Sequence, residues 1–196
     1  MNCFVTGVPL SDIHREFFST RENDQNWRIM ITSSELSFLC KKVAASLNAK
    51  FANAQNEVNL VGLLPGCIYF ISELTQHITF DYKLHFLQMS LYSDQMLNEA
   101  LSPFISEQNV VLIDDIVESG STMRRLLALI PQAFSCTCLS VQKQISFCGC
   151  DFVPRCKLAG FGIAQNGRKM NWDHILCSEG ENIVFEFRKQ FEGIFE

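Results

Sequence analysis

The sequence predicts one α/β domain, in which a mainly parallel sheet is flanked by helices and further segments are added at both termini. Short, branched apolar runs typical of buried strands alternate along the chain with amphipathic helical patterns. No internal repeat, low-complexity tract or interdomain linker interrupts the 196 residues. Alternating strands and helices of this kind favour a single sheet covered on both faces.

The first helix and strand are expected between residues 33 and 64. Thr32 and Glu35 form a capping-box pattern ahead of an apolar stripe at helical spacing, so a core helix is expected over residues 33–47. An apolar run over residues 58–64 then predicts a strand, which Pro65 ends, and helical character resumes directly afterwards.

The clearest buried strand lies over residues 109–113, a branched apolar run bounded by polar residues. We expect this strand to end at Asp114, and a loop over residues 115–121 to lead into a helix over residues 122–130. The polar segment of residues 92–108 is interpreted as a mobile connection. The other expected strands are residues 84–91, 138–143 and 158–163.

Charge argues against one class of partner. Sixteen Lys and Arg against 21 Asp and Glu give a formal charge of -5, whereas a nucleic-acid binder needs a dominant basic face. An anionic small molecule needs only a few basic groups or free backbone amides, particularly when a metal ion accompanies it. The net charge therefore does not exclude an anionic small-molecule ligand.

Cysteine content and hydropathy indicate the compartment. The nine cysteines are an odd number, which excludes a complete set of internal disulfides and favours a reduced, cytoplasmic protein. No secretory signal pattern opens the sequence. The longest apolar stretch, residues 58–71, is interrupted by Pro65 and is shorter than a bilayer span, so no membrane association is expected.

The chemistry is expected where the buried strand leads into its helix, because ligands of parallel sheets bind beyond the carboxyl ends of the strands. Adjacent carboxylates there can accept from a sugar diol or hold hydrated magnesium. Gly120 permits close backbone approach, and the following amides and hydroxyls can receive a phosphate at the helix N-terminus. The plainer alternative is that the acids close a strand and a hydroxyl caps a helix. The segment reads Asp114, Asp115, Ile116, Val117, Glu118, Ser119, Gly120, Ser121 and Thr122.

This segment resembles the phosphoribosyl pyrophosphate (PRPP) signature of type I phosphoribosyltransferases. In that signature four apolar residues precede two acids, two aliphatic residues, an acid, Thr or Ser, Gly, any residue and Thr. Further matching segments follow in the family's order along residues 28–175. Together they indicate the hypoxanthine-guanine branch of the family. It assigns Leu64, Pro65, Gly66 and Cys67 to the pyrophosphate loop, Arg168 to a place near pyrophosphate, and Lys143, Lys157 and Leu158 to the purine pocket.

The resemblance implies a reaction and roles within it. A phosphoribosyl group would pass from PRPP to N9 of a 6-oxopurine, with Mg²⁺ as cofactor and nucleotide and pyrophosphate as products. Asp114 and Asp115 would hold the ribose hydroxyls and metal-bound water, residues 119–122 would bind the 5-phosphate, and Glu118 would be the general base. Lys143 would donate to O6 of hypoxanthine or guanine, which disfavours adenine.

Four positions depart from the family pattern. Pro65 stands where the pyrophosphate loop of the family has a lysine, and Leu91 stands where the family has a serine. Lys157 takes the place of an aromatic residue that stacks on the purine, and Ala164 takes the place of an aspartate that binds magnesium. These departures motivate a second hypothesis, a diverged nucleotide- or PRPP-binding regulator that keeps the fold.

The resemblance also implies a division of the chain. Residues 28–176 would form the phosphoribosyltransferase core, residues 1–27 a segment of a small hood, and residues 177–196 a Phe-rich segment packed on hood or core. A homo-oligomer, dimer or tetramer, is what the family suggests. Cysteines 136, 138, 148, 150 and 156 offer an alternative zinc site, although their Cys-x-Cys spacing is unusual for zinc.

Overall fold

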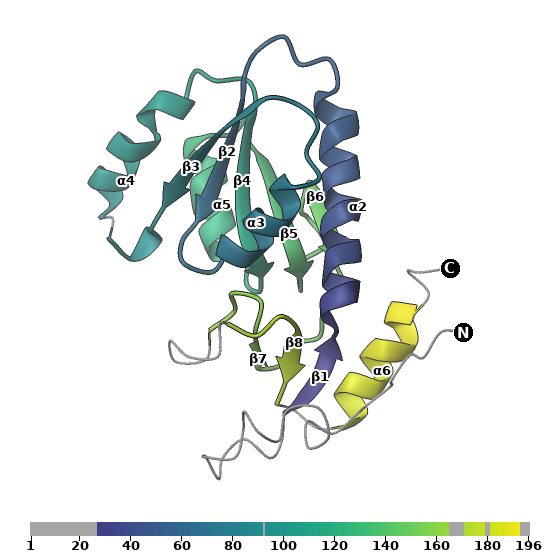
Figure 1. Ribbon diagram of the computed structural model, residues 1–196. Coiled ribbons are helices and arrows are strands. Elements are labelled where there is room, and N and C mark those ends of the chain that lie inside the picture. Colours follow the sequence, from purple (N-terminus) through teal and green to yellow (C-terminus); the bar gives the residue numbers. More distant parts are fainter. Residues whose placement is uncertain (1–26, 92, 165–170, 179–180, 193–196) are drawn as a thin grey trace. The chain divides into compact units, whose positions relative to one another are not determined.

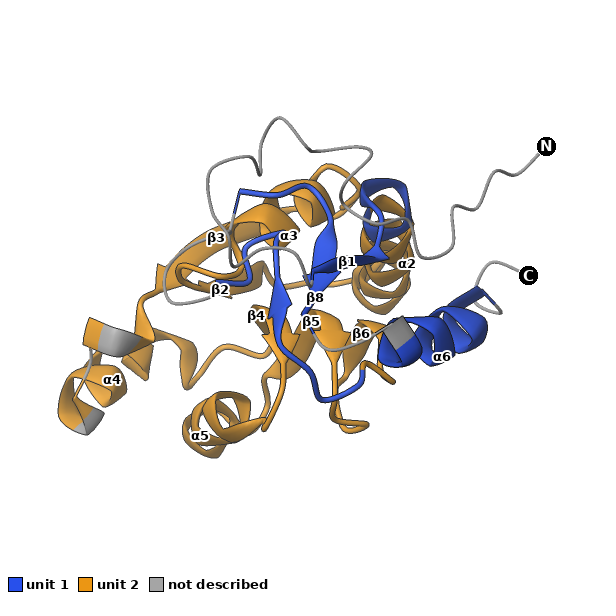
Figure 2. Cartoon of the chain, turned by 90° about the horizontal axis from the view of Figure 1, so that it is seen from below, with its two compact units in different colours: residues 1–36, 154–196 blue, residues 37–153 orange. Residues whose placement is uncertain are grey.

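The computed structural model describes residues 27–91, 93–164, 171–178 and 181–192 (Figure 1). The chain forms two compact units, one of residues 37–153 and one of residues 1–36 with 154–196 (Figure 2). The α/β fold class is confirmed, because the larger unit is built on a parallel sheet flanked by helices. The three-segment division of the chain at residues 27 and 177 stays a prediction.

Five parallel strands form the sheet of the larger unit, in the order β3-β2-β4-β5-β6. The central strand β4 aligns Val111 with Leu60 of β2 and with Phe134 of β5. Every residue of β2 is buried, as expected of a strand covered on both faces. The strands are β2 Val58–Leu63, β3 Tyr82–Leu87, β4 Val110–Val117, β5 Phe134–Ser140 and β6 Phe147–Cys150.

Helices cover both faces of this sheet. In Figure 2, α2 (Ser33–Phe51) and α3 (Ile68–Thr75) lie on one face, and α5 (Ser121–Leu129) lies on the other. The predicted capping box at the start of α2 is confirmed. The Thr32 amide donates to Glu35 Oε2 at 2.8 Å, and the Glu35 amide contacts Thr32 Oγ1 at 3.4 Å.

Most of residues 93–108, within the segment interpreted as a mobile connection, is helical. These residues contain α4 (Asp94–Leu101) and the short 3₁₀ helix η2 (Ser102–Phe104). Ser93 caps α4 by accepting from the Met96 amide. Leu97, Leu101 and Phe104 of this segment are buried in the same core cluster as Leu112 and Leu126. The prediction failed because few apolar residues in a polar segment are enough to pack a short helix.

Four predicted strands also differ from the structure in their limits. β4 continues through Asp114 to Val117, because β5 pairs with it as far as Val117 opposite Ser140. β3 ends at Leu87, and Met89–Leu91 is a 3₁₀ turn. β5 begins at Phe134 and ends before Lys143, and the strand expected over residues 158–163 is only Leu158–Ala159, β7.

The smaller unit contains a three-stranded antiparallel sheet, ordered β1-β8-β7. Its other elements are β1 (Arg28–Ile31), β8 (Ile175–Cys177) and α6 (Glu181–Phe191). A buried ion pair joins α6 to the start of α2, with Arg188 Nη1 lying 2.6 Å and 2.7 Å from the two Glu35 carboxylate oxygens. Segments from both ends of the chain therefore build one small unit.

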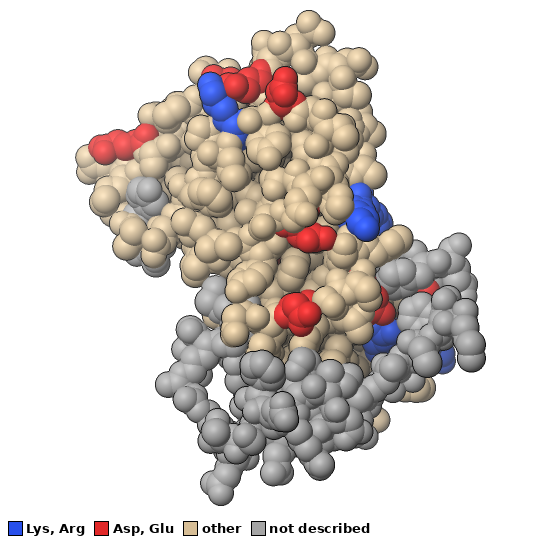
Figure 3. All heavy atoms as spheres, in the orientation of Figure 1, with Lys and Arg blue, Asp and Glu red and all other residues tan. Residues whose placement is uncertain are grey.

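Two observations bear on the nucleic-acid and membrane partners that the sequence disfavours. On the face shown in Figure 3, Lys and Arg of the described residues are few and separated, unlike the continuous basic surface that binds a nucleic-acid backbone. None of the helices within the described ranges has the length and apolar character to cross a bilayer.

Candidate active site

The β4–α5 connection forms a pocket of about 280 Å³. Gly120 adopts φ 73°, a left-handed conformation that favours glycine, and it directly precedes α5. The hydroxyls of Ser119 and Ser121 are 3.0 Å apart, and the Ser121 amide donates to Ser119 Oγ at 3.3 Å. The lining residues are Asp114, Ile116, Val117, Glu118, Ser119, Gly120, Ser121, Thr122 and Met123. All of these except Met123 were predicted as site residues.

Two neighbouring carboxyl groups lie at the end of β4. Asp115 is 8% exposed, and its Oδ1 accepts from the Ile116 amide at 2.9 Å. Burial, and next the negative charge of Asp115, raise the pKa of Asp114 to about 8. Burial also raises the pKa of Asp115, and the negative charge of Glu118 raises it further. Two such carboxyls are more stable when a cation neutralises them.

The loop after β2 lies against these acids. A methyl group on Gly66 would lie 2.7 Å from both carboxylate oxygens of Asp115, so only glycine fits this approach. The Leu64–Pro65 peptide is cis. Burial, and next the charges of Asp114 and Asp115, raise the pKa of the Cys67 thiol to about 12. The structure thus brings the predicted pyrophosphate loop and the predicted acid pair together.

The end of β5 fixes the backbone of the acidic segment. Thr137 Oγ1 donates to the Asp115 carbonyl at 3.0 Å, and the Val141 amide donates to the Val117 carbonyl at 3.0 Å. The side-chain amide of Gln142 donates to the Glu118 carbonyl at 2.6 Å. Sequence reasoning missed Thr137 and Gln142. The only signal for Gln142 was its position next to Lys143.

Several other predicted residues do not line this pocket. They are Asp115, Leu64, Pro65, Gly66, Cys67, Lys143, Lys157 and Leu158. Lys143 is exposed in the bend after β5. Lys157 is exposed and Leu158 is buried, and both belong to the smaller unit. Arg168 lies outside the described residues.

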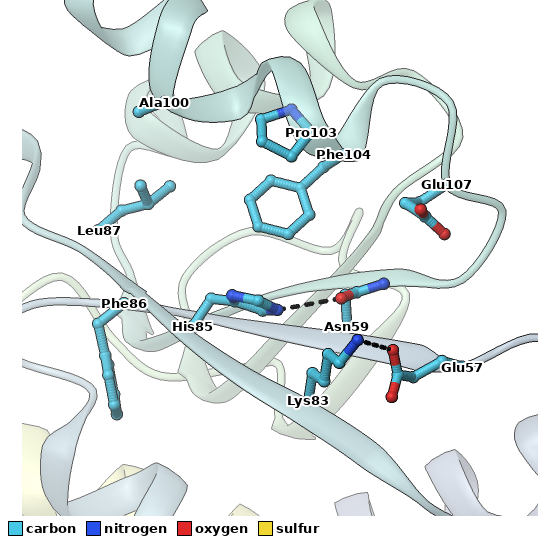
Figure 4. Close-up of a pocket in the computed structure, with 10 residues that line it drawn as sticks. All are labelled: Glu57, Asn59, Lys83, His85, Phe86, Leu87, Ala100, Pro103, Phe104 and Glu107. Carbon is cyan, nitrogen blue, oxygen red and sulfur yellow. Dashed lines mark hydrogen bonds and ion pairs between the residues drawn. The ribbon is translucent and has the colours of Figure 1, made fainter.

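A second pocket of about 440 Å³ lies along β3, between that strand and η2 (Figure 4). Four of its polar side chains are paired with one another. Lys83 forms an ion pair with Glu57, and His85 Nε2 is 3.0 Å from Asn59 Oδ1. The ring of Phe104 packs edge-on against His85. This pocket includes none of the residues that the sequence singled out.

The cysteines proposed as an alternative zinc site are largely buried as thiols. Burial is the main cause that raises the pKa of Cys136, Cys148 and Cys150, whereas a hydrogen bond with Cys40 is the main cause for Cys138. A raised pKa disfavours the thiolate that binds zinc. Within the described ranges, no cluster of three or more His, Cys, Asp or Glu side chains is arranged to hold a metal ion.

A parallel sheet with paired acids at a strand end, followed by a glycine turn and a helix N-terminus, is the arrangement with which α/β proteins bind phosphorylated ligands. The family model described as "Phosphoribosyl transferase domain" matches residues 30–138. Because the match covers more than half of the chain, the chain belongs to this family.

Individual relatives agree with this assignment. The hypoxanthine phosphoribosyltransferase of Buchnera aphidicola is 27% identical over 154 residues, covering 69% of this chain and 86% of the relative. The hypoxanthine-guanine phosphoribosyltransferase of Mycoplasma genitalium is 26% identical over 171 residues, covering 79% and 97%. The crystal structure of HGPRT-ase from Leishmania tarentolae in complex with GMP shares the fold, with a TM-score of 0.67 and 19% identity over 79% of this chain and 98% of that one.

Proposed function

We propose that the chain is a purine-salvage enzyme that transfers the 5-phosphoribosyl group of PRPP to hypoxanthine or guanine. The products are IMP or GMP and pyrophosphate. The observation that carries the proposal is the contact of Gly66 with Asp115, which assembles the pyrophosphate loop and the acid pair beside the β4–α5 pocket. The names of the Buchnera and Mycoplasma relatives support the same substrate class.

The pocket has a group for each part of PRPP. The backbone amides and hydroxyls of residues 119–122 bind the 5-phosphate at the N-terminus of α5. Asp114 and Asp115 accept hydrogen bonds from the ribose hydroxyls, and their close negative charges suit a magnesium ion with its water. Such an ion supplies charge that neutralises the departing pyrophosphate. Leu64, Pro65, Gly66 and Cys67 with Arg168 contact that pyrophosphate.

Glu118 is the general base of the proposal. As N9 of the purine forms its bond to C1′ of the ribose, the bond from C1′ to the pyrophosphate oxygen breaks, and the electron pair leaves with pyrophosphate. The Glu118 carboxylate takes the proton that the purine ring loses. The carboxylates of Asp114 and Asp115 stabilise the positive charge that develops on the ribose.

Lys143, Lys157 and Leu158 form the base-binding part of the proposal. The Lys143 ammonium donates to O6 of hypoxanthine or guanine. Adenine carries an amino donor at that position, so the two donors repel each other. The further proposals are a cytoplasmic location, a homo-oligomer, and no nucleic-acid or membrane partner.

A second candidate is a PRPP- or nucleotide-binding regulator without catalysis. Pro65 favours it, because proline brings neither the charge nor the N–H that the family's lysine offers pyrophosphate. Lys157 and Ala164 favour it as well, since they replace an aromatic residue and a carboxylate.

One assay separates the two candidates. Purified protein is incubated with PRPP and Mg²⁺ and with hypoxanthine, guanine, xanthine or adenine, and nucleotide and pyrophosphate are quantified. An enzyme forms both products in equal amounts with a 6-oxopurine and only traces with adenine. Omission of Mg²⁺ is the matched control. Measurable GMP or PRPP binding without turnover of any base would reject the enzyme and favour the regulator.

A further inference from the structure

The guanidinium of Arg124 lies over the first turn of α5. A methyl group on Gly120 would be only 2.8 Å from Arg124 Nη1. The Arg124 amide donates to the Gly120 carbonyl at 2.9 Å, so the two residues are joined by the first helical hydrogen bond. The side chain therefore turns back toward the helix N-terminus, the direction in which helical side chains lean.

A cation at this place is unfavourable in the protein alone. The N-terminus of a helix carries a partial positive charge, which repels Lys and Arg and attracts anions. The first turn of α5 contains no acidic residue. Among the residues that the structure describes, the Arg124 side chain has no ion-pair partner. Two positive features therefore converge on the same point.

Arg124 is not among the residues that line the pocket, but it lies beside two that are. Its Nη1 approaches Gly120, and Ser121, three positions before it in α5, shares its side of the helix. The chain from Asp114 to Thr122 contributes three carboxylates to the site and no Lys or Arg. A phosphate monoester of nearly two negative charges would gain a charge-assisted hydrogen bond from a cation there, in addition to those from backbone amides.

We propose that Arg124 is a phosphate-binding residue, which donates from its guanidinium to the 5-phosphate of PRPP and of the nucleotide product. This proposal rests on the proposed function, because it assumes that a phosphoribosyl ligand enters the β4–α5 pocket. It adds a cation to a site that otherwise offers amides and hydroxyls. The planar guanidinium presents several donors in one plane, which suits two phosphate oxygens at once.

The test compares ligands that carry the 5-phosphate with one that lacks it. Titration calorimetry measures the affinity of GMP, ribose 5-phosphate and guanosine for the wild type and for Arg124→Gln. We expect Arg124→Gln to weaken GMP and ribose 5-phosphate by about tenfold or more, the effect of losing a charge-assisted hydrogen bond. Guanosine should bind both proteins equally. Lys41→Gln, which removes one exposed charge from α2, is the matched control and should bind all three ligands like the wild type.

The outcomes also separate this proposal from the proposed function. GMP affinity of Arg124→Gln within twofold of the wild type would overturn the role of Arg124, as would an equal loss in Lys41→Gln. If the wild type binds neither GMP nor PRPP, the proposed function fails first.

Thermal unfolding without ligand is a second measurement that tests the role of Arg124. Arg124→Gln should melt at the same temperature or higher, because a cation is removed from the positive end of α5, and a lower melting temperature would contradict the repulsion inferred here.

Discussion

The side-chain amide of Gln142 donates a hydrogen bond of 2.6 Å to the backbone carbonyl of Glu118. Gln142 directly precedes Lys143, the residue proposed to recognise the purine, and Glu118 is the proposed base. Ser140 holds the Gln142 backbone in turn, because its hydroxyl accepts from the Gln142 amide at 2.9 Å. One side chain thus links the segment after β5, which carries Lys143, to the β4–α5 loop, which carries the proposed base.

Replacing Gln142 with alanine should lower kcat with little change in PRPP binding, because the loop that carries Glu118 loses one anchor. The net free energy of one hydrogen bond corresponds to a fall in kcat of about threefold to tenfold. Steady-state kinetics with PRPP and hypoxanthine measure the effect. Gln144→Ala, an exposed neighbour in the same bend, is the control and should keep wild-type kcat. A change in KM for PRPP alone would reject a positioning role for Gln142.

Asp114 should make the stability of the ligand-free protein depend on pH. Its pKa is raised to about 8, whereas the ordinary value is 3.8. Between these values the folded state binds more protons than the unfolded state, so the free energy of unfolding should fall as pH rises from about 4 to about 8. Asp114→Asn should reduce that fall and raise stability at pH 8 relative to the wild type.

Urea unfolding in EDTA at pH 5.5 and pH 8 measures this difference. The exposed Asp81→Asn is the control and should show the wild-type slope. If Asp114→Asn and the wild type lose the same stability between the two pH values, folding does not raise the pKa of Asp114.

The ion pair between Arg188 and Glu35 should be essential to the smaller unit. Both side chains are buried, with exposures of 7% and 5%. Arg188→Met should cost about 3 to 5 kcal/mol, because the Glu35 carboxylate would remain buried without its partner. Denaturant unfolding followed by circular dichroism measures the loss. The adjacent Lys189, which is exposed, offers the control Lys189→Met. Equal losses in the two variants would show that the pair contributes no more than surface charge.

The sequence predicted those parts of the fold that local chemistry determines. The capping box of Thr32 and Glu35 and the buried strand before Asp114 depend on short-range patterns, and both are present. The loop from Asp114 to Thr122 was found because its acids, glycine and hydroxyls are contiguous. Its neighbours Gly66 and Gln142 come from distant segments, and their contacts depend on strand order and register.

Other failures had the same origin. The helix α4 depends on Leu97 and Leu101 packing into a core that the local sequence does not reveal. Arg124 was not singled out because an arginine in a helix is usually a solvated surface residue. The position of its guanidinium over Gly120 can be interpreted only when the left-handed turn and the pocket are known from the structure.

The most direct test of the account is the rate of IMP and pyrophosphate formation by Glu118→Gln, measured beside its affinity for GMP. Glutamine has nearly the same shape as glutamate but cannot accept the purine proton as a carboxylate does. The account predicts a loss of turnover of about a hundredfold or more with GMP affinity close to that of the wild type. Glu107→Gln, at the opposite ends of the strands, should retain full turnover. Unchanged turnover in Glu118→Gln would contradict the assignment of Glu118 as the base and of the β4–α5 loop as the catalytic site.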